Sequence, residues 1–261
     1  MLPRLLLLLA ITSSVWPQTQ PASTIRFEDA TAASGIQFTH SFGAEKLGSL
    51  LESTGGGCVW FDYNNDGLPD LYVVSGKPLE NGVQPYPLKQ RPATPPHNHL
   101  YRNNGNGTFT DVTDQAGVAA NIYGMAAIAA DFDNDGFVDL FVTGYGKAIL
   151  YRNKGDGTFE DVTQKAGIHV EGWSISSAWL DYDRDGCVDL FVGRYVKFDP
   201  KYRAFYAADN YLCGHRRHGC GPHAAPGTDW QSFYSLDLYA LASRRHDPGS
   251  SCRTRAGQAR R

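Results

Sequence analysis

The sequence predicts an all-β protein, a β-propeller of four-stranded antiparallel blades in which about three blades are present and the ring is incomplete. An aspartate-rich loop occurs three times, and a second motif recurs fifty residues apart. Short runs of strand-forming residues accompany both motifs, and sustained helical periodicity is absent. Repeats of roughly 20–50 residues are typical of propellers, solenoids and arrays. Four short antiparallel strands per repeat indicate a propeller blade.

Each aspartate-rich loop has the pattern Asp-x-(Asp/Asn)-x-Asp-Gly-x-x-Asp-Leu and leads into an apolar run. Carboxylates about 4 Å apart repel one another by about 4 kcal/mol per pair at an effective dielectric near 20. Such a loop therefore stays splayed in water or holds a cation. The candidate ligands, five in each loop, are Asp62, Asn64, Asp66, Leu68 and Asp70, then Asp131, Asp133, Asp135, Phe137 and Asp139, then Asp181, Asp183, Asp185, Cys187 and Asp189.

Calcium is the cation that suits these loops best. It takes six to eight oxygen ligands, whereas zinc prefers His or Cys. The seventh residue of each loop is expected to contribute its backbone carbonyl, and glycine at the sixth position permits a sharp turn. An EF-hand would need Glu at the twelfth position, where these loops have Val73, Val142 and Val192. The alternative is a hairpin held by Asx turns and solvated, with no metal.

The second motif, Leu-Tyr-Arg-Asn followed by Gly-x-Gly-Thr-Phe-x-Asp-Val-Thr, begins at Leu100 and at Leu150. Its Asp-Gly and Asn-Gly pairs are hairpin signals. Residues 25–31 resemble the last strand of a unit and are expected to complete a final blade. Pro-rich or polar insertions are expected at residues 75–98 and 197–227. The expected strands of one unit are 126–130, 140–143, 148–152 and 158–162, and the expected blades are 56–113, 124–163 and 174–227.

The two ends of the chain differ from this repeat region, which spans residues 25–227. Residues 1–22 place Arg4 before a short apolar run, as in a secretory signal peptide; a buried N-terminal helix is the alternative. Export to the cell surface, the periplasm or the medium is therefore expected, and no stretch is long enough to span a membrane. Because propellers have roughly four to eight blades, we expect a truncated copy of a longer protein, with residues 228–261 non-native. The alternative is a genuine basic tail.

The distribution of charged residues and cysteines limits the classes of partner and site that we expect. Residues 24–227 contain 17 Lys and Arg against 24 Asp and Glu, which favours cations and argues against nucleic acid. In an exported chain, Cys213 and Cys220 are the expected disulfide pair. The alternative is a zinc or copper site formed by these cysteines with the nearby histidines. Cys58 and Cys187 lie beside predicted strands, where burial is the simplest expectation.

The loops and the Asn-Lys-Gly-Asp-Gly-Thr-Phe segment that begins at Asn153 resemble FG-GAP/VCBS repeats, as in integrin α-subunit propellers. More narrowly, Gly55-Gly56-Gly57 and Cys220-Gly221-Pro222 resemble the cartilage acidic protein (ASPIC/UnbV) family of secreted proteins. The resemblance covers roughly residues 25–227 and implies a calcium-stabilised propeller without assigned catalysis. The chain departs from the family in having too few blades and no C-terminal ASPIC/UnbV domain.

We therefore expect a secreted, calcium-binding module that is not an enzyme and that binds an extracellular protein or glycan. The alternative is a propeller-fold polysaccharide-degrading enzyme or a carbohydrate-binding lectin, in which paired carboxylates would act as acid and base. No nucleophile motif supports the enzyme, and calcium already accounts for the clustered aspartates.

Overall fold

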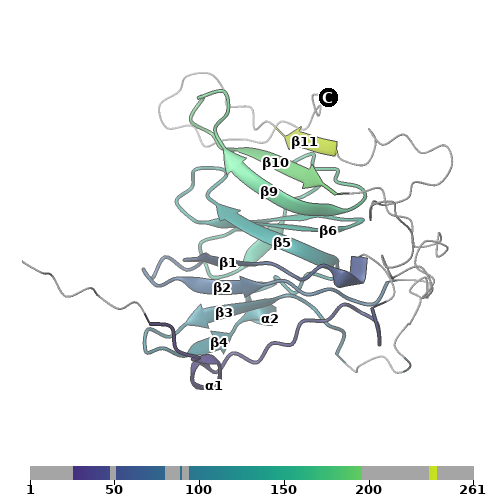
Figure 1. Ribbon diagram of the computed structural model, residues 1–261. Coiled ribbons are helices and arrows are strands. Elements are labelled where there is room, and N and C mark those ends of the chain that lie inside the picture. The colour runs from purple at the N-terminus through teal and green to yellow at the C-terminus, as the bar shows by residue number, and fades with distance from the viewer. Residues whose placement is uncertain (1–25, 48–50, 80–88, 90–93, 196–234, 240–261) are drawn as a thin grey trace, which may run out of the picture. The chain divides into compact units, whose positions relative to one another are not determined.

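The computed structural model describes residues 26–47, 51–79, 89, 94–195 and 235–239 (Figure 1). The chain divides into two compact units, residues 1–30 and residues 31–261, and the sheets belong to the second. Within the described residues there are three antiparallel sheets, two of four strands and one of three. All-β architecture is thus confirmed, although the described sheets do not form a closed ring.

The two complete sheets repeat one another. Their strands pair in chain order, as expected for meander blades. Each aspartate loop joins the first and second strands, so the pattern of the sequence is reproduced in both. The first sheet contains β1 (Cys58–Phe61), β2 (Asp70–Val73), β3 (His99–Asn103) and β4 (Phe109–Asp111), and the second contains β5 (Tyr123–Ala130), β6 (Asp139–Tyr145), β7 (Ile149–Asn153) and β8 (Phe159–Asp161).

The third sheet has the order β11-β10-β9. It contains β9 (Ser174–Leu180), β10 (Asp189–Arg194) and β11 (Ser235–Tyr239). β11 pairs antiparallel with β10 from Leu190↔Tyr239 to Arg194↔Ser235. The sheet therefore extends beyond the boundary expected at residue 227, into the stretch interpreted as a non-repeat tail.

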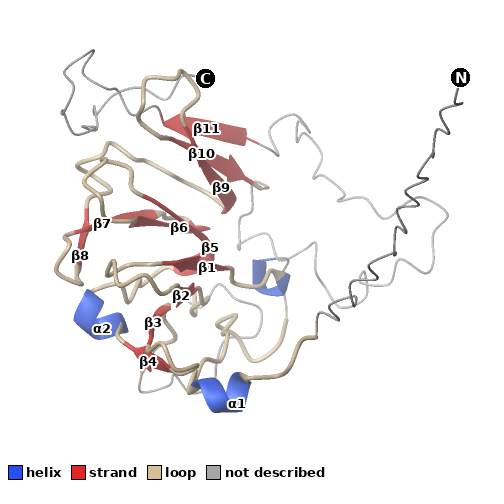
Figure 2. Ribbon diagram, turned by 90° about the vertical axis from the view of Figure 1, so that its left-hand side faces the viewer, coloured by secondary structure: helices blue, strands red, loops and turns tan. Residues whose placement is uncertain are grey.

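The first strands of the three sheets lie side by side. β5 is adjacent to β1 and to β9, and Figure 2 shows the later strands of each sheet farther away. The backbone N–H of Gly57 donates to the carbonyl of Met125 at 2.8 Å, which ties the first sheet to the second. Tyr145 and Trp173 form a bridge between the second and third sheets.

Two apolar clusters fill the spaces between the sheets. The cluster between the first and second sheets includes Tyr72 and Val142, both fully buried. The cluster between the second and third includes Phe141 and Leu190. Burial of side chains on both faces of the second sheet is the main apolar stabilisation of the described fold. It also fixes the positions of the loops that the strands carry.

The N-terminal segment differs from expectation. Residues 26–30 form no strand in this structure, so closure of a final blade by residues 25–31 stays a prediction. The repeat motif nevertheless has a counterpart here, because the short helix α1 (Thr31–Ser34) corresponds to α2 (Thr113–Ala116) after β4. Both helices are followed by a glycine with left-handed φ, +75° at Gly35 and +74° at Gly117.

Candidate metal centre

The aspartates at the first and fifth positions hold each loop in one conformation. The first accepts hydrogen bonds from the backbone N–H groups of the fifth and sixth residues, at 2.8–3.1 Å in all three loops. The fifth accepts from the N–H of the seventh at 2.9–3.0 Å. These are Asx-type turns, in which a short carboxylate side chain satisfies its own backbone. The loops are therefore ordered by their own side chains, as the metal-free alternative also predicts.

The aspartate at the ninth position is buried beneath each loop. Asp70 and Asp139 have no exposed surface, and Asp189 is 1% exposed. Each accepts a hydrogen bond from the backbone N–H of the loop's second residue at 3.0–3.1 Å. Burial raises the pKa of Asp139 to about 7, against the lowering effect of these N–H donors. The free loop therefore tends to retain a proton that a bound cation would replace.

The fourth and sixth residues of each loop have positive φ. The glycines Gly67, Gly136 and Gly186 adopt 83°, 89° and 88°, and the residues before the fifth aspartate, Asn65, Asn134 and Arg184, adopt 56°, 55° and 60°. Asparagine is among the few residues other than glycine that often visit the left-handed region. This conformation directs the fourth side chain away from its own loop.

Two of these fourth residues connect neighbouring loops. The Asn65 side-chain amide donates to the carbonyl of Gly136 in the second loop at 2.9 Å. The Asn134 amide donates to the carbonyl of Gly186 in the third loop at 3.0 Å. The contact therefore repeats from sheet to sheet and fixes the spacing of adjacent loops.

Replacing Asn134 with glycine should lower the free energy of unfolding by about 0.5–1 kcal/mol, because the exposed amide bond is lost while glycine keeps the positive φ. The matched control is Arg184→Gly at the same position of the third loop, where the side chain makes no hydrogen bond to the described residues. That change should be neutral or stabilising, since the left-handed conformation is costly for arginine. Urea unfolding measures both. Equal stability of the two variants would show that the contact between loops contributes nothing.

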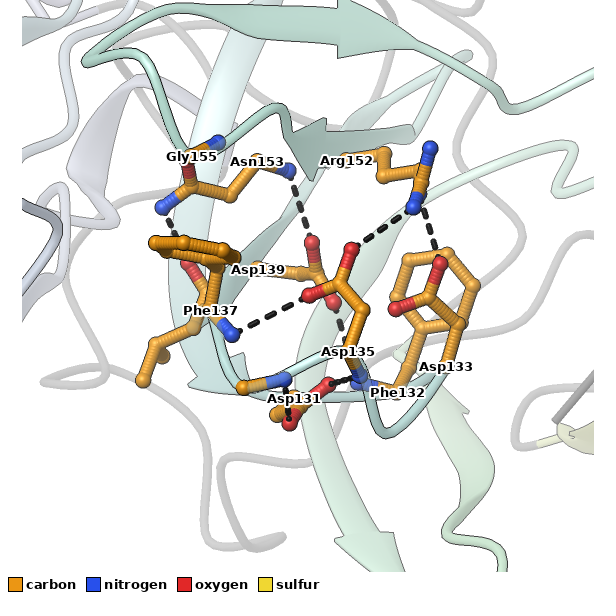
Figure 3. Close-up of polar contacts among 11 residues, drawn as sticks. Asp131, Phe132, Asp133, Asp135, Phe137, Asp139, Arg152, Asn153 and Gly155 are labelled. Carbon is orange, nitrogen blue, oxygen red and sulfur yellow. Dashed lines mark hydrogen bonds and ion pairs between the residues drawn. The ribbon is translucent and has the colours of Figure 1, made fainter. Parts of the chain in front are cut away.

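Carboxylates converge in the second and third loops. One oxygen from each of Asp131, Asp133 and Asp139 lies within 4.8 Å of the others, and Asp181, Asp183 and Asp189 form the same group. Figure 3 shows the aspartates of the second loop and their hydrogen bonds. The first loop has Asn64 at the third position, and its amide donates to Asp66 Oδ2 at 2.8 Å. A grouping of three carboxylates in two loops is the arrangement that a hard dication would neutralise.

Asp133 provides the observation that points to a ligand. The residue is 9% exposed, and its Oδ1 is buried without a hydrogen-bond partner. Its Oδ2 accepts from Arg152 Nε at 2.6 Å. A buried carboxylate oxygen without a donor is costly. An oxygen-only donor set with one unsatisfied oxygen fits Ca²⁺ or another hard cation and does not fit zinc, which prefers nitrogen and sulfur.

The structure separates the predicted ligands into two sets. In the second and third loops the first, third and ninth residues come together, whereas the fifth aspartates, Asp135 and Asp185, lie outside the group. The Asp135 carboxylate accepts from Phe137 N–H and from Arg152. At the seventh position, the N–H groups of Leu68, Phe137 and Cys187 donate within their loops. Whether their carbonyls bind a metal stays a prediction.

Sequence reasoning missed residues that surround the loop. The backbone N–H groups of Asn103 and Asn153 each donate at 2.7 Å to the buried aspartate of their sheet. Arg152 holds two loop carboxylates. All three belong to the Leu-Tyr-Arg-Asn motif, which was recognised as a repeat but not connected with the loop. Its recurrence after each of the first two loops was the available signal.

The profile of the FG-GAP-like repeat matches residues 62–142 and 131–192, which together span half of the 261 residues. The chain belongs to the FG-GAP-like repeat family. Both matches begin at the first aspartate of a loop, so the FG-GAP-like unit includes the carboxylate groups described above. No curated protein matches the chain significantly.

The cysteines of this FG-GAP-like protein differ from expectation. Cys58 is exposed and free, so the expectation of burial is wrong there. Cys187 is buried and disulfide-bonded, with a partner outside the described residues. The expected Cys213–Cys220 pair, and its alternative as a metal site, also lie outside the described residues.

In the part of the chain that the structure describes, no helix is both long and apolar enough to cross a membrane.

Proposed function

We propose that this chain is a secreted, calcium-binding FG-GAP-like repeat protein that acts as a non-enzymatic binding or adhesion module. The observation that carries the calcium proposal is the unpartnered, buried Oδ1 of Asp133, in a side chain grouped with Asp131 and Asp139. A divalent cation there would satisfy this oxygen and cancel the repulsion among the three carboxylates. The loops would then pin the first and second strands of each sheet together.

The loop hydrogen bonds support a preformed site. Each first-position aspartate already accepts two backbone N–H groups, so little further ordering is needed when a cation binds. Extracellular calcium sites bind at about 10⁻⁴–10⁻³ M. At roughly 10 mM calcium, such a site stabilises the fold by about 2 kcal/mol.

We expect calcium to raise the melting temperature of the chelator-treated protein by several degrees per occupied site, with a much smaller effect of magnesium, which requires stricter octahedral geometry. Asp133→Asn should weaken calcium binding at the second loop about tenfold, because one charge is lost. This change reproduces the asparagine that the first loop has at the same position, Asn64. Isothermal titration calorimetry and thermal melting measure the two effects.

The control is Asp156→Asn, which removes the same charge from an exposed turn of the same sheet. The first repeat naturally has Asn106 there, and both side chains accept the N–H of the following threonine at 3.0 Å. The control should bind calcium as the unmodified protein does. If calcium changes neither melting temperature nor heat of titration, the calcium proposal is wrong.

The proposal of a non-enzymatic role rests on the aspartate loops. The grouped aspartates have hydrogen-bonding roles inside the turns, and no described observation favours the polysaccharide-degrading or lectin alternative. We propose an extracellular protein or glycan as the partner and secretion through the segment 1–22. Narrower membership in the ASPIC/UnbV family is part of the same proposal, supported by the Gly55-Gly56-Gly57 and Cys220-Gly221-Pro222 sequences. A propeller arrangement of the sheets is also proposed, supported by the same strand order in the two complete sheets.

A further inference from the structure

In the two complete sheets, the Leu-Tyr-Arg-Asn motif supplies contacts to the aspartate loop from the third strand. The asparagine has the same role in both complete sheets. The backbone N–H of Asn103 donates to Asp70, and that of Asn153 donates to Asp139, at 2.7 Å in both cases. Each asparagine amide also donates to the carbonyl of the loop's eighth residue, at 3.0 Å and 3.1 Å. The asparagine is therefore a constant part of the repeat.

The arginine of the motif differs between the two sheets. In the second sheet, Arg152 reaches two loop carboxylates, with Nε 2.6 Å from Asp133 Oδ2 and a terminal nitrogen 2.6 Å from Asp135 Oδ2. Figure 3 shows the guanidinium bridging these two side chains. In the first sheet, Arg102 makes no ion pair with the described residues. The arginine of the motif thus pairs with carboxylates of the second loop, whereas the arginine at the same position of the first sheet does not pair with the first loop.

The third residue of the loop explains this difference. In the first loop, the amide of Asn64 donates to Asp66 Oδ2 at 2.8 Å, so a neutral neighbour satisfies the fifth aspartate. In the second loop, the third residue is Asp133, which has no donor to offer. The corresponding oxygen, Asp135 Oδ2, is satisfied by Arg152 instead. Arg152 therefore supplies the positive charge that the additional carboxylate requires.

Arg152 also occupies carboxylate oxygens that a cation could use. Asp135 is held by Arg152 on one oxygen and by Phe137 N–H on the other, and it lies outside the group formed by Asp131, Asp133 and Asp139. Asp133 keeps Oδ1 unpartnered but shares Oδ2 with the guanidinium. A cation that recruits Asp135, or both oxygens of Asp133, must displace the arginine or share its carboxylates.

We propose that Arg152 is an internal counter-cation that holds the second loop in the metal-free state and competes with calcium for Asp133 and Asp135. This inference rests on the proposed calcium binding. The second loop then keeps its shape without metal but needs more calcium for occupancy than its four carboxylates alone would suggest. Adjacent loops of one chain respond to different calcium concentrations, because only the second of the two complete sheets has this clamp.

The test compares Arg152→Met with Arg102→Met, the same change at the matching position of the first sheet. Methionine keeps the aliphatic length of the side chain and removes the charge. For Arg152→Met, we expect a lower melting temperature in chelator and about tenfold tighter calcium binding at the second loop. In saturating calcium, its melting temperature should approach that of the unmodified protein. Arg102→Met should change neither quantity at that loop.

Calcium itself is the probe, measured by calorimetry and by melting with and without chelator. A merely structural role of Arg152 would lower the melting temperature equally in both conditions and leave calcium affinity unchanged or weaker, which would overturn the proposal. Arg152→Lys, which keeps the charge without the planar fork, provides a milder variant, with calcium binding about threefold tighter. If the unmodified protein binds no calcium, the proposed function fails together with the competition. If it binds calcium and Arg152→Met does not bind more tightly, only the competition fails.

Discussion

Replacing Asp139 with alanine should lower the free energy of unfolding by about 3 kcal/mol, even in chelator. Asp139 is fully buried, and its two oxygens accept the backbone N–H groups of Asn153 at 2.7 Å and Phe132 at 3.0 Å. Alanine would leave both donors without an acceptor, and each buried, unsatisfied donor costs about 1–3 kcal/mol. Part of this loss is offset, because the variant no longer buries a carboxyl group whose pKa is raised by burial.

Urea unfolding in chelator separates this structural loss from any loss of metal. The matched control is Asp161→Ala at the end of β8, an exposed carboxylate that, among the described residues, accepts from the N–H and hydroxyl of Thr163. That change should cost less than about 1 kcal/mol. Asp70→Ala in the first sheet should reproduce the Asp139 result, because Asp70 has equivalent partners. A loss at Asp139 no greater than at Asp161 would mean that the loop is not anchored through this residue.

The strands and loops of the complete sheets were predictable because two repeats of one pattern can be compared. The expected strands at 126–130 and 140–143 fall within β5 and β6, and those at 148–152 and 158–162 overlap β7 and β8. Alternating apolar residues and Asp-Gly turns act locally, so sequence spacing reports them well. Consecutive strands are neighbours in both complete sheets, which is the usual arrangement for elements that follow one another in the chain.

The contacts of the candidate site were less predictable. The contacts of Asp133 and Asp135 with Arg152 depend on the pairing of β6 with β7, because Arg152 lies on β7. The contact of Asn134 with Gly186 depends on the spacing of two sheets. The spacing of residues within one loop does not indicate how close Arg152 or Gly186 lies to that loop. These partners are therefore seen only in the folded structure.

A Gly56→Ala variant should be destabilised by about 3 kcal/mol or more, a large effect for one added methyl group. A Cβ at Gly56 would lie 2.0 Å from the carbonyl oxygen of Val74 and 2.9 Å from its carbonyl carbon. These are backbone atoms of a chain held by the Val74 N–H to Gly57 carbonyl bond at 2.9 Å. Neither the backbone at Gly56 nor that at Val74 can move away without breaking the pairing that leads into β1 and β2.

The neighbouring Gly55 provides the control, because a Cβ there meets no atom within 4 Å. Gly55→Ala should be neutral or slightly stabilising, since alanine restricts the unfolded chain. Gly57 also donates to Met125 of β5, so displacement at Gly56 would loosen the first sheet from the second and move the Asn65–Gly136 contact between their loops. We therefore expect Gly56→Ala to broaden the thermal transition and to weaken calcium binding, while Gly55→Ala changes neither. Similar stability of the two variants in urea would mean that the first two sheets are not packed as closely as described.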